Sequence, residues 1–120
     1  MKVAVSSQGD TLASVVDKRF GRCGYFIVVD TETGEFEAVP NAAGDPAHGA
    51  GVGAVRLLAS LGVSAVLVGN VGPNAFEALQ RAGIAAYLVD CETVGDAVDR
   101  FKAGLVKRLD AASGPSHGGW

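Results

Sequence analysis

The stretch that decides the fold is GVGAVRLLASLGVSAVLVGNVGPNAFEALQRAGIAAYLVD, residues 51–90. Apolar residues at helical spacing predict a helix over 51–62, and the apolar run at 63–69 predicts a buried strand. A second helix is predicted over 73–83, between a proline and a glycine, and a second strand over 84–90. Strands that alternate with helices predict parallel pairing through right-handed crossovers.

Three further strands precede this stretch, and one helix follows it. MKVAVS (1–6), YFIVVDT (25–31) and FEAVP (36–40) read as strands, and the last two are close enough to form a hairpin. A final helix is predicted over 93–109, with Leu105 on its apolar face. The expected fold is therefore α/β, with a single mixed five-stranded sheet in the order 3-2-1-4-5. In this ribonuclease H-like arrangement the second strand is antiparallel to the rest and helices cover both faces.

Length and composition place the chain among single-domain globular proteins. It has 120 residues, of which 48% are hydrophobic, and a formal net charge of −3. We expect a single α/β domain over 1–109 and a flexible, Gly/Ser-rich tail over 110–120. No apolar run is long enough to span a membrane and the N-terminus lacks a signal-peptide pattern, so we expect a cytoplasmic protein with no membrane partner. The acidic balance argues against nucleic acid as a partner.

The predicted topology brings the unusual loops of the chain to one end of the sheet. If the first strand points up, the loop after it (residues 7–24) crosses the top, because the second strand begins there. The segments after the third and fourth strands, 40–51 and 69–74, then also lie at the top. Open α/β sheets bind ligands at this carboxyl end of their strands.

The residues of these loops predict a site for an anion. Lys18, Arg19 and Arg22 supply positive charge, and glycines leave backbone N–H groups accessible at the starts of two helices. The candidate binding residues are Arg19, Phe20, Gly21, Arg22, Cys23, His48, Gly49, Gly51, Gly69, Asn70, Gly72, Pro73 and Asn74.

Cys23 and His48 are the candidate metal ligands, because thiolate and imidazole are soft and borderline donors. Nearby Lys18 and Arg22 would favour the thiolate form of Cys23. The Cys and His residues of the chain are scattered, without the paired spacing of a zinc site, and two cysteines do not make a disulfide framework.

Other interpretations remain open from the residues alone. The glycines could be ordinary turn residues, and the arginines could be solvated or paired with Asp10 or Asp17. GAGVGA (49–54) matches a dinucleotide fingerprint, but it follows a long loop and the strand after it ends without an acid for a ribose. A nucleophile such as Ser6, Ser7 or Cys23 could meet His48, yet the spacing places no acidic third member.

DKRFGRCGYFIVVD (17–30), followed by the 51–90 stretch, resembles the dinitrogenase iron–molybdenum cofactor biosynthesis family, which includes NifX-like proteins and the C-terminal domain of NifB. The resemblance covers about residues 1–107, and its signature is RFGR, then GAG, then GPNA. It implies that the chain is not an enzyme. The implied function is to bind an anionic metal–sulfur cluster without covalent bonds, and to carry or protect it.

Within that family, RFGRCGYF and the small size are most similar to members that hold a molybdenum–copper sulfide cluster. The implied cofactor is that cluster or one like the iron–molybdenum cofactor, and the implied partner is a protein that donates or receives it. A different class of function also stays open. A small domain of this kind could bind a phosphate-bearing metabolite or a partner protein, without any metal.

Overall fold

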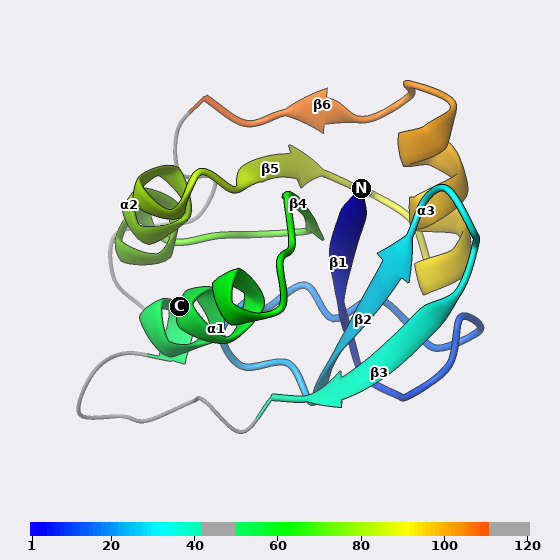
Figure 1. Cartoon of the computed structure of the whole chain (residues 1–120), viewed down its shortest axis with the longest axis horizontal. Helices are drawn as coiled ribbons and strands as arrows, with labels where there is room; N and C mark the ends of the chain where they lie inside the picture. The colour runs from blue at the N-terminus through cyan, green and yellow to red at the C-terminus, as the bar shows by residue number, and fades with distance from the viewer. Residues whose placement is uncertain (42–49, 111–120) are drawn as a thin grey trace.

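A computed structural model describes residues 1–41 and 50–110 of the chain, and its sheet contains six strands in the order β3-β2-β1-β4-β5-β6 (Figure 1). No helix in these two ranges is long and apolar enough to cross a membrane. The elements are β1 (Lys2–Ser7), β2 (Tyr25–Asp30), β3 (Phe36–Pro40), α1 (Ala50–Ser60), β4 (Ala65–Val68), α2 (Pro73–Ala82), β5 (Ala85–Leu88), α3 (Val94–Lys102) and β6 (Lys107–Arg108).

The order of the first five strands is confirmed, and the predicted number of strands is wrong. β1 pairs parallel with β4 and antiparallel with β2, as expected, and β4 pairs parallel with β5. The sixth strand, β6, adds to the outer edge of β5 in the antiparallel sense. It has only two residues, a lysine and an arginine, so it carries no apolar pattern that predicts a strand. The ribonuclease H-like classification stays a prediction.

The predicted final helix over 93–109 is wrong at its C-terminal end, because α3 ends at Lys102. Gly104 adopts a left-handed conformation with φ of 73°. Its N–H donates to the carbonyl oxygen of Phe101 at 3.1 Å, and the N–H of Leu105 donates to that of Arg100 at 2.9 Å. This pair of bonds is a Schellman motif, which ends a helix and turns the chain away. Leu105, expected on a buried face, is consequently 71% exposed.

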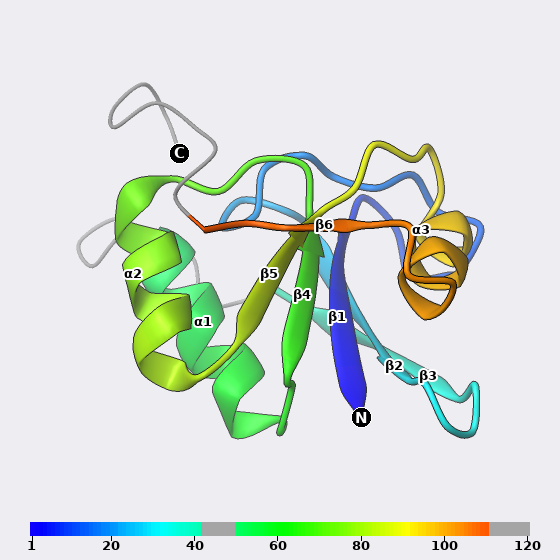
Figure 2. The same cartoon turned by 90° about the horizontal axis from the view of Figure 1, so that it is seen from above.

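The three helices cover both faces of the sheet, as predicted: α1 and α2 pack on one face and α3 on the other (Figure 2). Each central strand therefore buries both of its sides. In β1, for example, Ala4 joins the cluster under α1 and α2, whereas Val3 and Val5 join the cluster under α3. Strands buried on both faces read as continuous apolar runs, which is why β1, β2 and β4 were recognisable in the sequence.

The helices α1 and α2 approach each other closely near their N-terminal ends. A Cβ atom placed on Gly51 would lie 2.7 Å from the Cβ of Ala75. Real Cβ atoms do not come that close, so this contact needs a glycine in α1 opposite a small residue in α2. Gly51, which the sequence assigned to a bare helix start, therefore also sets the spacing of the two helices.

We predict that Gly51→Ala lowers the free energy of unfolding by about 1–2 kcal/mol, because overpacking outweighs the roughly 1 kcal/mol that alanine contributes as the better helix former. In the double variant with Ala75→Gly the added methyl group has room, so the two substitutions should couple favourably. Urea unfolding of the two single variants and the double variant measures this coupling. Strictly additive effects would show that the helices do not touch at this pair.

Candidate functional site

The loop between β1 and β2 crosses the carboxyl end of the sheet and contacts the segment after β4. Arg19 and Asn70 form a parallel bridge, and the N–H of Asn70 donates to the carbonyl oxygen of Lys18 at 3.0 Å. A Cβ atom on Gly69 would lie 3.0–3.1 Å from Lys18 atoms, so glycine permits this close approach. The structure therefore brings the predicted segments 19–23 and 69–74 together, and we call this edge the rim.

Asn41 fastens the end of β3 to the same loop. Its side-chain nitrogen Nδ2 donates to the carbonyl oxygens of Gly21 and Cys23, at 3.0 Å each, and its backbone N–H donates to that of Gly24 at 3.0 Å. Its oxygen Oδ1 is buried and accepts no hydrogen bond from the residues that the structure describes. Sequence reasoning missed Asn41, although a polar residue directly after a strand at this edge is a usable signal. His48 and Gly49 lie outside the described residues.

Asp17 forms hydrogen bonds and an ion pair with the basic segment of the loop. Its carboxylate, on a side chain only 5% exposed, accepts from the backbone N–H of Arg19 at 2.9 Å and from Nε and Nη2 of Arg19 at 3.2 Å each. The hydrogen bond and negative charge of Asp17 raise the pKa of the Arg19 guanidinium. Arg19 is thus already paired, which is one of the alternatives left open by the sequence.

Lys18 and Arg22 are the other two basic side chains of this loop. Both are exposed, and neither has an ion-pair partner among the described residues. Because Asp17 neutralises much of the charge of Arg19, these two residues supply most of the positive charge that the rim offers to an anion.

Phe20 and Cys23 point away from solvent and belong to the core. Phe20 is 2% exposed, and its ring centroid lies 5.4 Å from that of Phe26. Cys23 is 4% exposed, and its Sγ donates to the carbonyl oxygen of Phe20 at 3.3 Å. Burial raises the pKa of the Cys23 thiol to about 12. The expectation that Lys18 and Arg22 favour a thiolate is therefore wrong, because burial and, after it, the negative charge of Asp17 both disfavour the ionised thiol.

The N-terminus of α2 has no side-chain cap. Its N-cap residue is Gly72, which has an extended backbone, is followed by Pro73 and has no side chain that could accept from the first turn. The N-terminus of α3 is different, since the side chain of Thr93 accepts there from the N–H of Asp96 at 3.3 Å. An uncapped helix start keeps its partial positive charge available to an anion.

The serine hydroxyl groups of β1 make hydrogen bonds to the loop after β1, and neither is exposed as a nucleophile would be. Ser6 Oγ donates to the carbonyl oxygen of Asp17, and Ser7 Oγ donates to that of Gly9, both at 2.8 Å. Both serines are buried. In the part of the chain that the structure describes, no three His, Cys, Asp or Glu side chains gather as a site for a metal ion.

Comparison with known proteins identifies relatives along nearly the whole chain. The family described as dinitrogenase iron-molybdenum cofactor matches residues 1–104. The Methanocaldococcus jannaschii protein MJ0580 is 30% identical over 113 residues, which are 92% of each chain.

Solved structures of similar sequence have the same fold. The apo form of the orange protein from Desulfovibrio gigas is 42% identical, with a TM-score of 0.90 over 94% of this chain and 96% of that one. A Thermotoga protein provisionally described as NifB, of the DUF35 family, is also 42% identical, with a TM-score of 0.82 over 94% of this chain and 97% of that one.

The buried thiol predicts a pH dependence of stability. Its pKa of about 12, against an ordinary 9.0, means that the folded state holds the proton more tightly than the unfolded state does. This tighter proton binding contributes to the free energy of unfolding. The contribution is fully present below about pH 9 and is lost as the pH rises toward 12. Between about pH 8 and 10, we expect the wild type to lose about 1 kcal/mol more unfolding free energy than Cys23→Ala. Urea unfolding of reduced protein measures both slopes, and equal slopes would contradict burial of the thiol.

Proposed function

The chain belongs to the dinitrogenase iron-molybdenum cofactor family, and from this premise we propose that it binds an anionic, molybdenum-containing metal–sulfur cluster without covalent bonds and carries or protects it. Similarity to the orange protein makes a molybdenum–copper sulfide cluster the first candidate, and a cluster like the iron–molybdenum cofactor the second. In this function the cluster is cargo, and the partner is the protein that donates or receives it. We propose the cytoplasm as the place of this exchange.

The observation that carries the proposal is the uncapped start of α2 beside a basic loop. Asn70, two residues before the N-cap Gly72, is hydrogen-bonded to the loop that presents Lys18 and Arg22. Backbone N–H groups and exposed cations therefore belong to neighbouring segments of the rim. A sulfide cluster is a bulky polyanion, so it is suited to hydrogen-bond donors and positive charge that are spread over a surface.

The state of Cys23 supports a cargo that arrives preassembled. A metal ion taken up bare needs several protein donors, and a thiol must ionise before it binds a metal. Cys23 is buried, protonated at neutral pH and hydrogen-bonded to Phe20. In a preformed cluster, sulfide already occupies the coordination positions of the metals, so the protein supplies only hydrogen bonds, charge and shape.

Arg22 provides the first test of the proposal. Titration with tetrathiomolybdate and cuprous ion should colour the wild type, and Arg22→Ala should weaken binding by about 1.5–3 kcal/mol if the arginine makes a charge-assisted hydrogen bond. Arg100→Ala, an exposed arginine of α3 on the other face of the sheet, is the matched control and should bind as the wild type does. Absorption spectra and elemental analysis of protein purified without oxygen or chelators measure the bound metals.

Two results would count against the cluster. Equal binding by the Arg22→Ala and Arg100→Ala variants would show that the rim is not part of the binding site. A colourless wild type without molybdenum, with rim amides that shift when phosphate is added, would favour the metal-free alternative of a phosphate-bearing metabolite.

Cys23→Ser tests whether a protein thiolate is needed. We expect the folded variant to bind the preassembled molybdenum–copper sulfide cluster with the visible spectrum of the wild type, because a buried neutral thiol makes no bond to the cargo. Circular dichroism confirms that the variant is folded before it is titrated. Complete loss of binding by folded Cys23→Ser would make Cys23 a direct ligand, and would require this part of the chain to open when the cluster binds.

A further inference from the structure

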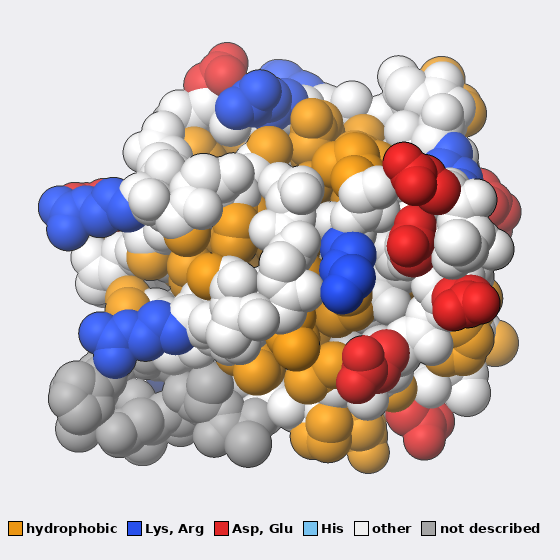
Figure 3. Space-filling view, viewed as in Figure 1, with side chains coloured by type: hydrophobic (Ala, Val, Ile, Leu, Met, Phe, Trp, Pro, Cys, Tyr) orange, Lys and Arg blue, Asp and Glu red, His pale blue; other side chains and the backbone are white. Residues whose placement is uncertain are grey.

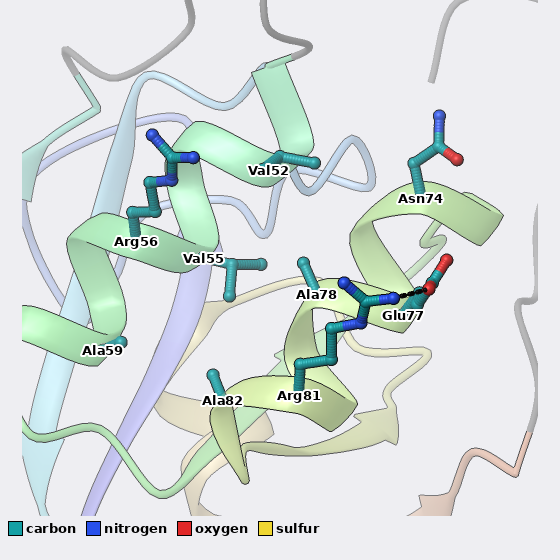
Figure 4. A pocket seen from close by; sticks show the side chains of 9 residues that line it. All are labelled: Val52, Val55, Arg56, Ala59, Asn74, Glu77, Ala78, Arg81 and Ala82. Atoms are coloured by element: carbon teal, nitrogen blue, oxygen red, sulfur yellow. Dashed lines mark hydrogen bonds and ion pairs between the residues drawn. The ribbon is translucent and has the colours of Figure 1, made fainter.

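A groove with a volume of about 460 Å³ runs between α1 and α2 (Figure 4). The residues that line the groove alternate along each helix with residues that face the sheet. Leu58 and Leu79 are completely buried between the helices and the sheet. Arg56 and Arg81 are exposed beside the groove. The groove therefore lies on the outer side of the helix pair. This volume is within the range of small-molecule sites, about 300–1,000 Å³.

The groove combines a small-residue apolar floor with cationic walls. The floor consists of Val52, Val55, Ala59, Ala78 and Ala82. Arg56 extends along the α1 side and Arg81 along the α2 side (Figure 4). The surface view likewise shows basic side chains on both sides of an apolar strip at this edge of the molecule (Figure 3). A surface of this composition suits a bulky anion with little bound water, because guanidinium groups are themselves weakly hydrated.

The groove is continuous with the rim. Asn74, a predicted rim residue in the first turn of α2, also lines the groove, and Val52 follows Gly51 at the contact between the two helices. An anion at the uncapped start of α2 would therefore reach the apolar floor without leaving the protein surface.

We propose that the groove is a second part of the cargo site, in which Arg56 and Arg81 select a sulfide-rich anion over an oxygen-rich one. This inference rests on the proposed function, and it names the part of the surface that determines specificity. A metal–sulfide anion spreads its charge over large, polarisable sulfur atoms and gives up its hydration readily. Phosphate and molybdate hold water tightly, and an apolar floor offers them no hydrogen bonds in exchange.

Glu77 sets the strength of this selection. Its Oε1 accepts from Nη2 of Arg81 at 2.7 Å, so one of the two cations is partly neutralised before an anion arrives. An anion in the groove competes with Glu77 for Arg81. Removing the charge of Glu77 should therefore strengthen binding, a result that would not follow if these side chains only stabilised the helix.

The test compares five proteins of full length: the wild type, Arg56→Gln, Arg81→Gln, Glu77→Gln and the control Arg100→Gln. Each arginine variant loses one positive charge, so the control accounts for the change in net charge. Titration with tetrathiomolybdate and cuprous ion should show affinity reduced about threefold to tenfold for Arg56→Gln and Arg81→Gln relative to Arg100→Gln, and increased about twofold to fivefold for Glu77→Gln. Molybdate, the oxygen-rich probe, should show no such differences.

The outcomes separate this inference from the function on which it rests. If the wild type binds the thiomolybdate probe but all four variants bind it equally, the groove is not part of the site and the rim alone holds the cargo. Backbone amide shifts at Val55 and Ala78 on titration support the groove directly, and shifts confined to 19–23 and 69–74 overturn it. A wild type that does not bind the probe overturns the proposed function itself.

Discussion

Parallel pairing of β1 with β4 is the constraint on which both the fold and the site depend. Val3 pairs with Ala65 and Val5 with Leu67 at the centre of the sheet, and β2 runs antiparallel on the other side of β1. Two chain segments that are far apart in the sequence, the long loop after β1 and the short one after β4, therefore leave the sheet at the same edge. The contact of Lys18 and Arg19 with Asn70, which builds the rim, follows from that arrangement.

The loop after β1 is long, yet hydrogen bonds to its backbone fasten it to the segments after β3, after β4 and before α3. Val16 donates its N–H to the carbonyl oxygen of Glu92 ahead of α3, Asn70 bonds to Lys18, and Asn41 bonds to Gly21 and Cys23. Within the loop, the carboxylate of Asp17 accepts three hydrogen bonds from Arg19. A buried carboxylate is costly unless its oxygens are satisfied, so Asp17 and Arg19 stabilise the loop as a unit.

Strands and helices were predictable from the sequence wherever burial produced a regular pattern of apolar residues. They were less predictable where a single residue determines the end of a helix or the presence of a strand. The apolar runs identified the five longer strands, and Gly62 and Gly83 were recognisable as helix ends. The end of α3 at Lys102 depends on the left-handed conformation of Gly104, and β6 depends only on pairing with β5. Convergence of the rim segments followed from topology. The roles of Asp17 and Asn41 did not, because they come from three-dimensional contacts that no spacing expresses.

The same limit applies to the charges of individual side chains, on which the proposed binding of an anionic cargo depends. From the sequence, Arg19 and Cys23 resembled a cation and a ligand; in the structure one is paired with Asp17 and the other is a buried neutral thiol. What remains for an anion is dispersed: the N–H groups at the start of α2, exposed cations and an apolar groove. In the proposed function, each such contact is individually weak and sensitive to salt, and together they would hold a large anion without a bond to its metals. A cluster held in this way is released by exchanging hydrogen bonds and charge with another surface, whereas a thiolate-bound cluster would have to break a metal–sulfur bond first.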